Sequence, residues 1–102
     1  MEPETIFVEV FGKSPLIKVL DFLITYQLFD YPLTEIAEKA GVSYSTLQTF
    51  WFKLEKNSIV IKTRRVGKSD LFKLNTNNPA VQQIIKLDWN LIMGTEQEAI
   101  TA

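Results

Sequence analysis

Residues 33–47, with the sequence LTEIAEKAGVSYSTL, predict two helices joined by a very tight turn. Apolar residues recur at helical spacing in the first half, which predicts a short helix over residues 35–40. Gly41 then suits the left-handed conformation in which helices commonly end. Ser43 is a typical N-cap and predicts the start of a second helix over residues 44–57. The chain therefore reverses direction within about three residues.

The helix over residues 44–57 has two different faces. Its buried stripe is predicted from the apolar residues that lie within one turn-width of each other, namely Leu47, Phe50, Trp51 and Leu54. The opposite face carries Ser45, Gln48, Thr49, Phe52 and Lys56, with Tyr44, Thr46 and Lys53 at its borders. This second face should be open to solvent.

Upstream of this stretch the sequence predicts a strand, a helix and a break. Residues 5–11 are rich in β-branched and aromatic side chains, which is typical of a strand. Ser14, followed by a proline, favours the start of a helix over residues 15–29. Residues 30–32, Asp-Tyr-Pro, end that helix. Thr34 is then expected to cap the next one.

Downstream, residues 59–75 predict a two-stranded hairpin. Its tip, residues 65–69, is basic, and Gly67 supplies the positive φ that such a turn requires. An Asn-Pro pair then predicts a last helix over residues 79–93. Residues 94–102 are expected to be frayed.

The stretch 33–47 resembles the helix-turn-helix of winged-helix proteins, such as the MarR and ArsR families of small bacterial and archaeal transcription regulators. Residues 53–64, KLEKNSIVIKTR, resemble the family's passage from the recognition helix into the wing, with Asn57 and Ser58 where the family favours glycine. The resemblance covers roughly residues 14–75. It implies an α+β fold with a three-helix core and a two-stranded wing, to which this chain adds an N-terminal strand and a C-terminal helix.

Composition agrees with one globular domain over residues 1–102. Hydrophobic residues make up 46% and charged residues 23% of the chain. There is no cysteine and no histidine, which excludes disulfides, thiol or histidine catalysis and the commonest zinc sites. We therefore expect no enzyme, no catalytic or metal-binding residue and no cofactor. No apolar run is long enough to span a membrane and no secretory signal pattern is present, so the cytoplasm is the expected compartment.

Charge is distributed unevenly along the chain. Residues 1–40 carry three Lys or Arg against seven Asp or Glu, and residues 75–102 carry one against three. Residues 41–74 carry seven Lys or Arg against two acids. A basic middle between acidic flanks indicates one surface that faces a polyanion.

Together with the resemblance, this charge pattern predicts sequence-specific binding of double-stranded DNA by a small transcription regulator. The expected DNA-binding residues are Tyr44, Ser45, Thr46, Gln48, Thr49, Lys53, Lys56, Lys62, Arg64, Arg65 and Lys68. Hydroxyl and amide side chains recognise base edges, and the cations neutralise phosphates. Alternatively, the cations are ordinary solvated side chains and the domain docks on another protein of a transcription or replication assembly. We expect Phe52 to pack against the wing or the last helix; its alternatives are a thymine methyl group or a partner protein.

The last helix is apolar over most of its girth, which predicts a homodimer. The expected interface residues are Val81, Ile85, Trp89 and Ile92. The N-terminal strand should join them. Alternatively, both elements complete a monomeric core. Too few residues lie outside the predicted DNA-binding unit for a separate ligand domain, and we expect no bound small molecule.

Overall fold

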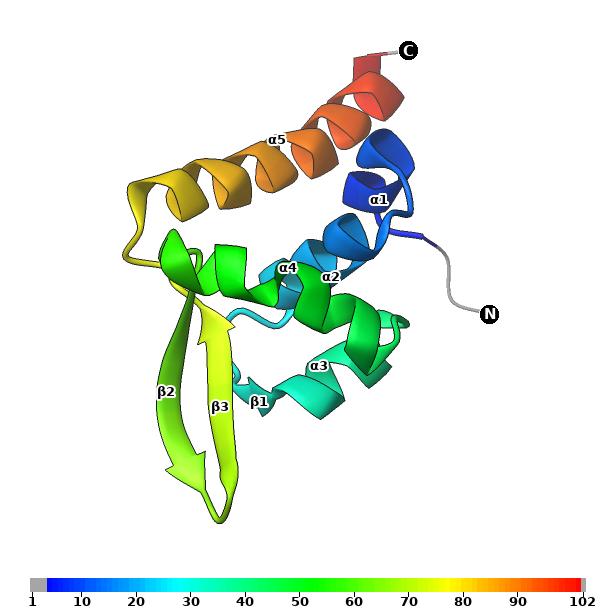
Figure 1. Cartoon of the computed structure of the whole chain (residues 1–102). Helices are drawn as coiled ribbons and strands as arrows, with labels where there is room; N and C mark the ends of the chain where they lie inside the picture. Colours follow the sequence, from blue (N-terminus) through cyan, green and yellow to red (C-terminus); the bar gives the residue numbers. More distant parts are fainter. Residues whose placement is uncertain (1–3, 102) are drawn as a thin grey trace.

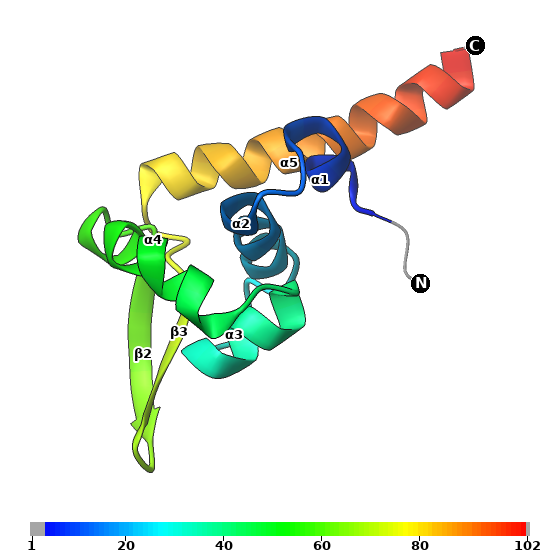
Figure 2. The ribbon, with the colours of Figure 1, turned by 45° about the vertical axis from the view of Figure 1, so that its right-hand side comes forward.

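The computed structural model describes the backbone of residues 4–101 and the side chains of residues 4–94. In chain order its elements are α1 (Ile6–Phe11), α2 (Pro15–Thr25), β1 (Tyr31–Pro32), α3 (Leu33–Ala40), α4 (Tyr44–Lys56), β2 (Val60–Val66), β3 (Ser69–Leu74) and α5 (Pro79–Thr101). Helices α2, α3 and α4 form the body, and the β2–β3 hairpin projects away from it (Figure 1). Helix α5 crosses the opposite end of the body with α1 against it (Figure 2). This arrangement confirms the predicted α+β fold of three core helices with a wing.

The core lies between the three body helices, the base of the sheet and the start of α5. Its buried members include Val19, Phe22, Leu23, Ile36, Ala37, Leu47, Trp51, Leu54, Val60, Phe72, Leu74 and Val81. The Trp51 ring meets the Phe72 ring edge-on, with the centroids 5.5 Å apart. This contact ties α4 to β3 and fixes the rotation of α4 about its own axis. The face of α4 opposite Trp51 is thereby turned to solvent.

The turn between α3 and α4 has the predicted chemistry. Gly41 is left-handed, with φ 76°, and Val42 N–H donates to the carbonyl of Ala37 at 2.9 Å. Ser43 Oγ accepts from the N–H of Thr46 at 3.2 Å, as an N-cap does. These bonds use backbone groups that the two helix ends would otherwise leave unpaired.

The predicted strand over residues 5–11 is wrong, because most of this segment is the short helix α1. Thr5 caps it, with Oγ1 accepting from Val8 N–H at 3.2 Å. One face buries Phe7 and Val8, and Phe11 lies one turn beyond Phe7 with the ring centroids 4.9 Å apart. Strand propensity depends on a neighbouring strand to pair with, and here packing against α2 and α5 outweighs it.

The segment between α2 and α3 also differs from expectation. Helix α2 ends at Thr25 rather than near residue 29, and Leu28 lies in the following turn with 83% of its surface exposed. The predicted break contains β1, which pairs antiparallel with β3 at the edge of the sheet. Because β1 leads straight into α3, that helix begins at Leu33, before the expected cap at Thr34.

The sheet has the order β1-β3-β2. Gly67 has φ 61° at the hairpin tip, as predicted. The register of β2 on β3 shifts between Lys62 and Arg64, where one extra residue bulges out of the ladder. At the end of α4 the left-handed residue is Ser58, with φ 57°, and not Asn57.

Helix α5 begins where the sequence predicts, with Asn78 Oδ1 accepting from Ala80 N–H at 2.8 Å. It continues to Thr101, so the expected fraying from Gly94 onward is wrong for the described backbone. Ala102, also expected to fray, lies outside the described residues. Over the described part of the chain, no helix is both long and apolar enough to cross a membrane.

Candidate nucleic-acid interface

The outward face of α4 displays the side chains that the sequence predicts there. Except for Thr46, which is half-buried, these side chains are exposed: Tyr44, Ser45, Gln48, Thr49, Phe52, Lys53 and Lys56. No hydrogen bond engages the Gln48 amide within the described part of the chain. Its donors and acceptor are therefore available to a ligand.

The hydroxyl groups at the start of α4 divide into two kinds. Thr46 Oγ1 accepts from Ser43 Oγ at 2.7 Å, and Thr49 Oγ1 donates to the carbonyl of Thr46 at 2.6 Å. These contacts stabilise the helix end. Ser45 Oγ lies 3.3 Å from Ser43 Oγ and remains exposed, so it is better placed to contact a partner.

The cations of the wing are balanced by acids to different degrees. Asp70 on β3 lies 3.5 Å from Lys62 Nζ and 3.9 Å from Arg65 Nη1. Lys68 is exposed at the hairpin tip and pairs with no acid among the described residues. The wing is thus less basic in space than its sequence suggests.

Arg64 is held by Asp30, in the segment before β1. Arg64 Nε lies 3.0 Å from Asp30 Oδ2 and Nη2 lies 3.2 Å from Oδ1, which is a two-pronged pair. The hydroxyl of the bulged Thr63 lies 2.6 Å from Asp30 Oδ2. Hydrogen bonds from Arg64 and then Thr63 lower the pKa of Asp30, and the same pair raises the pKa of Arg64. Arg64 is predicted to contact a phosphate, but in the structure it ties the wing to the body. Its third nitrogen, Nη1, takes no part in the pair with Asp30.

The start of α4 and the wing line one hollow of about 270 Å³. Tyr44 borders it on the helix side, and Lys68, Ser69 and Asp70 border it on the wing side. The N-terminal end of α4 and the wing therefore face the same space.

Phe52 does not pack against the wing or the last helix, and that expectation is wrong. Its ring is 59% exposed on the outer face of α4, with Lys53 Nζ 5.9 Å from its centroid. The ring is therefore open to a contact outside the chain.

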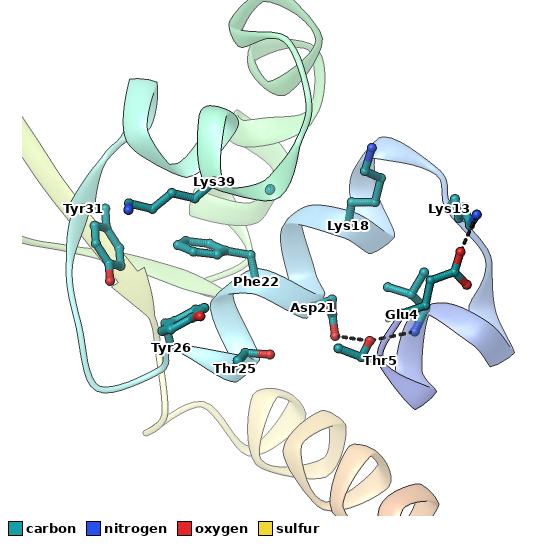
Figure 3. A pocket seen from close by; sticks show the side chains of 12 residues that line it. Glu4, Thr5, Lys13, Lys18, Asp21, Phe22, Thr25, Tyr26, Tyr31 and Lys39 are labelled. Atoms are coloured by element: carbon teal, nitrogen blue, oxygen red, sulfur yellow. Dashed lines mark hydrogen bonds and ion pairs between the residues drawn. The ribbon is translucent and has the colours of Figure 1, made fainter. Parts of the chain in front are cut away.

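A separate groove of about 660 Å³ lies between α1, α2, α3 and β1, so the expectation that the chain binds no small molecule is not supported. Figure 3 shows its aromatic end, where Phe22 lies between Tyr26 and Tyr31. Lys39 Nζ lies over the Tyr31 ring, 5.7 Å from the centroid. At the other end Lys18 Nζ donates to the carbonyl of Gly41 at 2.8 Å. Several of the groove's polar groups are therefore already partnered within the chain.

The last helix divides into a core-facing part and an open part. Val81 is fully buried in the single chain and Ile85 packs partly against the core, so neither is a free surface. Trp89 is 60% exposed, and Ile92 is also exposed. Of the four predicted interface residues, only the last two are open to a partner.

Two carboxylates lie where α5 passes α2. Burial raises the pKa of Asp21, although its hydrogen bond from Thr5 opposes this, and burial and the charge of Asp21 raise the pKa of Asp88. No group of three or more side chains suited to a metal ion occurs among the described residues. The charge of Asp21 thus adds to burial in disfavouring the ionised form of Asp88.

Three helices, a tight turn between the second and third, and a hairpin beside the third define a winged helix-turn-helix domain. The cations and amide groups of that third helix and the hairpin make this face the candidate interface for a nucleic acid.

Comparisons with known proteins agree on the fold. No family model matches the chain. Over 74 residues, 72% of this chain, it is 32% identical to the HTH-type transcriptional regulator IscR of Pectobacterium atrosepticum, and it covers 45% of that protein. The corresponding regulator of Escherichia coli is 28% identical, with 46% of its length covered. The chain thus spans less than half the length of these curated relatives.

Solved structures extend the likeness over more of the chain. The AntR antimony-specific transcriptional repressor superposes with a TM-score of 0.58 at 20% identity, covering 78% of this chain and 68% of that one. The apo form of a Lactococcus lactis ZitR mutant gives 0.66 at 13% identity, covering 93% and 74%. At such identities the likeness shows the fold alone.

Proposed function

We propose that this chain is a sequence-specific double-stranded DNA-binding transcription regulator of the MarR- and ArsR-like type. The observation that carries this proposal is the outer face of α4, which presents an unengaged amide and two lysines beside the wing. The regulators that the sequence matches support it. Such a protein acts in the cytoplasm and requires no cofactor or catalytic residue.

The proposed roles follow from the chemistry of each side chain. Gln48 pairs with a base edge in the major groove, and Ser45 contacts a base or the adjacent backbone. Lys53, Lys56 and Lys68 neutralise phosphates on either side of the groove. Tyr44 at the start of α4 borders the same hollow as Lys68 of the wing, so we expect one duplex to reach both elements.

The test is fluorescence anisotropy with random 30-bp duplex, titrated from low to physiological salt. We expect binding that weakens steeply as salt rises. A Lys53→Ala, Lys56→Ala variant should bind markedly more weakly. Lys86→Ala removes an exposed lysine from α5, away from the interface, and should bind like the unaltered protein. Absence of binding at low salt would contradict the proposal.

The proposed regulator is a homodimer through α1 and the open part of α5. Both helices expose large apolar side chains on this end of the molecule, namely Val10, Phe11, Leu87, Trp89, Ile92 and Met93. Two copies joined here would present two wings, as DNA with two half-sites requires. Sedimentation should show a dimer that Trp89→Glu converts to a monomer. Leu28→Glu changes an even more exposed apolar residue in the turn after α2 and should leave the dimer intact.

Docking on another protein is a second candidate, favoured by one specific observation. The turn after α2 exposes Tyr26, Leu28 and Phe29 together. Contiguous exposed apolar side chains are a common mark of a protein-binding surface. Two results together would favour this function. The unaltered protein would fail to bind DNA, and it would capture a protein partner that the Leu28→Ser variant does not capture.

A further inference from the structure

The ring of Phe52 is held outward by the packing of its neighbours. Trp51 is buried against Phe72, with the ring centroids 5.5 Å apart, and Phe50 is half-buried at the edge of the core. Successive side chains on an α-helix are rotated by about 100°. Anchoring Trp51 therefore turns Phe52 away from the core, and the ring cannot fold back without moving α4.

The surroundings of this ring are polar. Gln48 and Thr49 lie one turn before it and Lys56 lies one turn after it, on the same side of the helix. All three are exposed. The ammonium of Lys53 lies 5.9 Å from the ring centroid. Phe52 is thus a single apolar group set among hydrogen-bonding and cationic ones.

We propose that Phe52 recognises the C5-methyl group of a thymine in the major groove, an inference that rests on α4 being the DNA-recognition helix. That methyl group is the apolar feature which a base pair displays in the major groove. One helical turn rises about 5.4 Å, between one and two base-pair steps, so Phe52 and Gln48 would contact neighbouring pairs. Lys53 beside the ring is placed to neutralise a phosphate flanking the same pair.

A protein partner fits this position less well. Exposed large hydrophobic residues on α4 are Tyr44 and Phe52, which are separated by about two turns. Protein-binding surfaces are commonly marked by several exposed apolar side chains that form one contiguous patch. The polar surroundings of Phe52 match the edge of a base pair better.

The experiment removes the methyl group from the DNA and the ring from the protein. A preferred duplex is first selected from a random 30-bp pool with the unaltered protein. Each thymine is then replaced singly by deoxyuridine, which differs only in lacking the methyl group, and binding is measured by anisotropy at fixed salt. We expect about a fourfold loss of affinity at one or more positions, the effect of one apolar carbon. Phe52→Ser should bind the thymine and deoxyuridine duplexes equally. Leu16→Ser, which removes an exposed apolar side chain at the start of α2, should discriminate as the unaltered protein does.

Two results would overturn this inference. Indifference of the unaltered protein to deoxyuridine at every position would show that no methyl group is recognised. Undiminished discrimination by Phe52→Ser would assign the methyl contact to another residue and leave Phe52 for a protein partner. Failure to bind any duplex at low salt is a different outcome, because it refutes the proposed function itself. Phe52 is exposed, so its replacement should leave the melting temperature nearly unchanged, and circular dichroism checks this.

Discussion

Replacing Lys68 and replacing Arg64 should affect DNA binding differently, although both residues are cations of the wing. Lys68 has no acidic partner in the described part of the chain, whereas Arg64 is paired through two nitrogens with Asp30. A phosphate that meets Lys68 releases counterions from DNA. A phosphate that meets the Arg64–Asp30 pair meets a group with no net charge.

The magnitude follows from the count of unbalanced cations. Each phosphate neutralised contributes about 0.9 to the slope of log K against log salt. Lys53, Lys56 and Lys68, with the one positive charge that Asp70 leaves on Lys62 and Arg65, give a slope of about −3.6 per protomer. Lys68→Ala should reduce this to about −2.7, and Arg64→Ala should leave it near −3.6.

The assay is anisotropy at salt concentrations from about 50 to 200 mM, with one duplex for all variants. Asp30→Asn supplies the decisive comparison, because it frees the Arg64 guanidinium without removing it. Its slope should steepen by up to about 0.9. The reasoning is refuted if Arg64→Ala flattens the slope as much as Lys68→Ala does, or if Asp30→Asn leaves the slope unchanged.

Three further predictions concern stability. Gly41→Ala forces a side chain into a left-handed turn at φ 76° and should lower the free energy of unfolding by about 1 kcal/mol. Gly94→Ala, in α5 with open space around it, should raise the free energy of unfolding by up to about 1 kcal/mol. Calorimetry that shows no difference between the two variants would contradict this prediction. Asp88→Asn should raise the melting temperature at pH 7, because the raised pKa of Asp88 means that its charge disfavours the folded state above that pKa. The gain should shrink as pH falls through the raised pKa and vanish below the ordinary value of 3.8, and an unchanged gain at low pH would argue against a raised pKa of Asp88. Leu47→Ala removes a fully buried side chain and should cost about 3 to 5 kcal/mol in urea denaturation, so a loss below about 1 kcal/mol would contradict the assignment of Leu47 to the core.

Local chemistry explains which parts of the fold could be predicted from the sequence. The turn at Gly41 and the cap at Ser43 depend on side chains within three residues, and both predictions are confirmed. Helix α1 could not be predicted in this way. Its β-branched residues fit a strand, but the structure offers this segment a helical site against α2 and α5 and the Thr5 cap.

The candidate site shows the same division. The outer face of α4 follows from helical periodicity, so its exposed residues could be predicted. The partner of Arg64 could not, because Asp30 lies 34 residues earlier in the chain and approaches it only in the folded structure. Likewise, the sequence shows that Val81 and Trp89 are both apolar residues of the last helix. It does not show where α5 leaves the body, and this point decides that Val81 is buried and Trp89 is exposed.

The pairing of wing cations bears on where sequence preference arises. Lys62 and Arg65 share Asp70, and Arg64 is balanced by Asp30. Attraction of the wing to phosphates in general is therefore reduced, and Lys53, Lys56 and Lys68 supply most of the salt-dependent, non-specific binding. Discrimination between sequences must then come from groups that touch base edges, and these lie on α4. The acids hold the wing in place, so the wing positions α4 on the duplex. Because its cations are mostly paired, the wing adds little affinity for DNA of the wrong sequence.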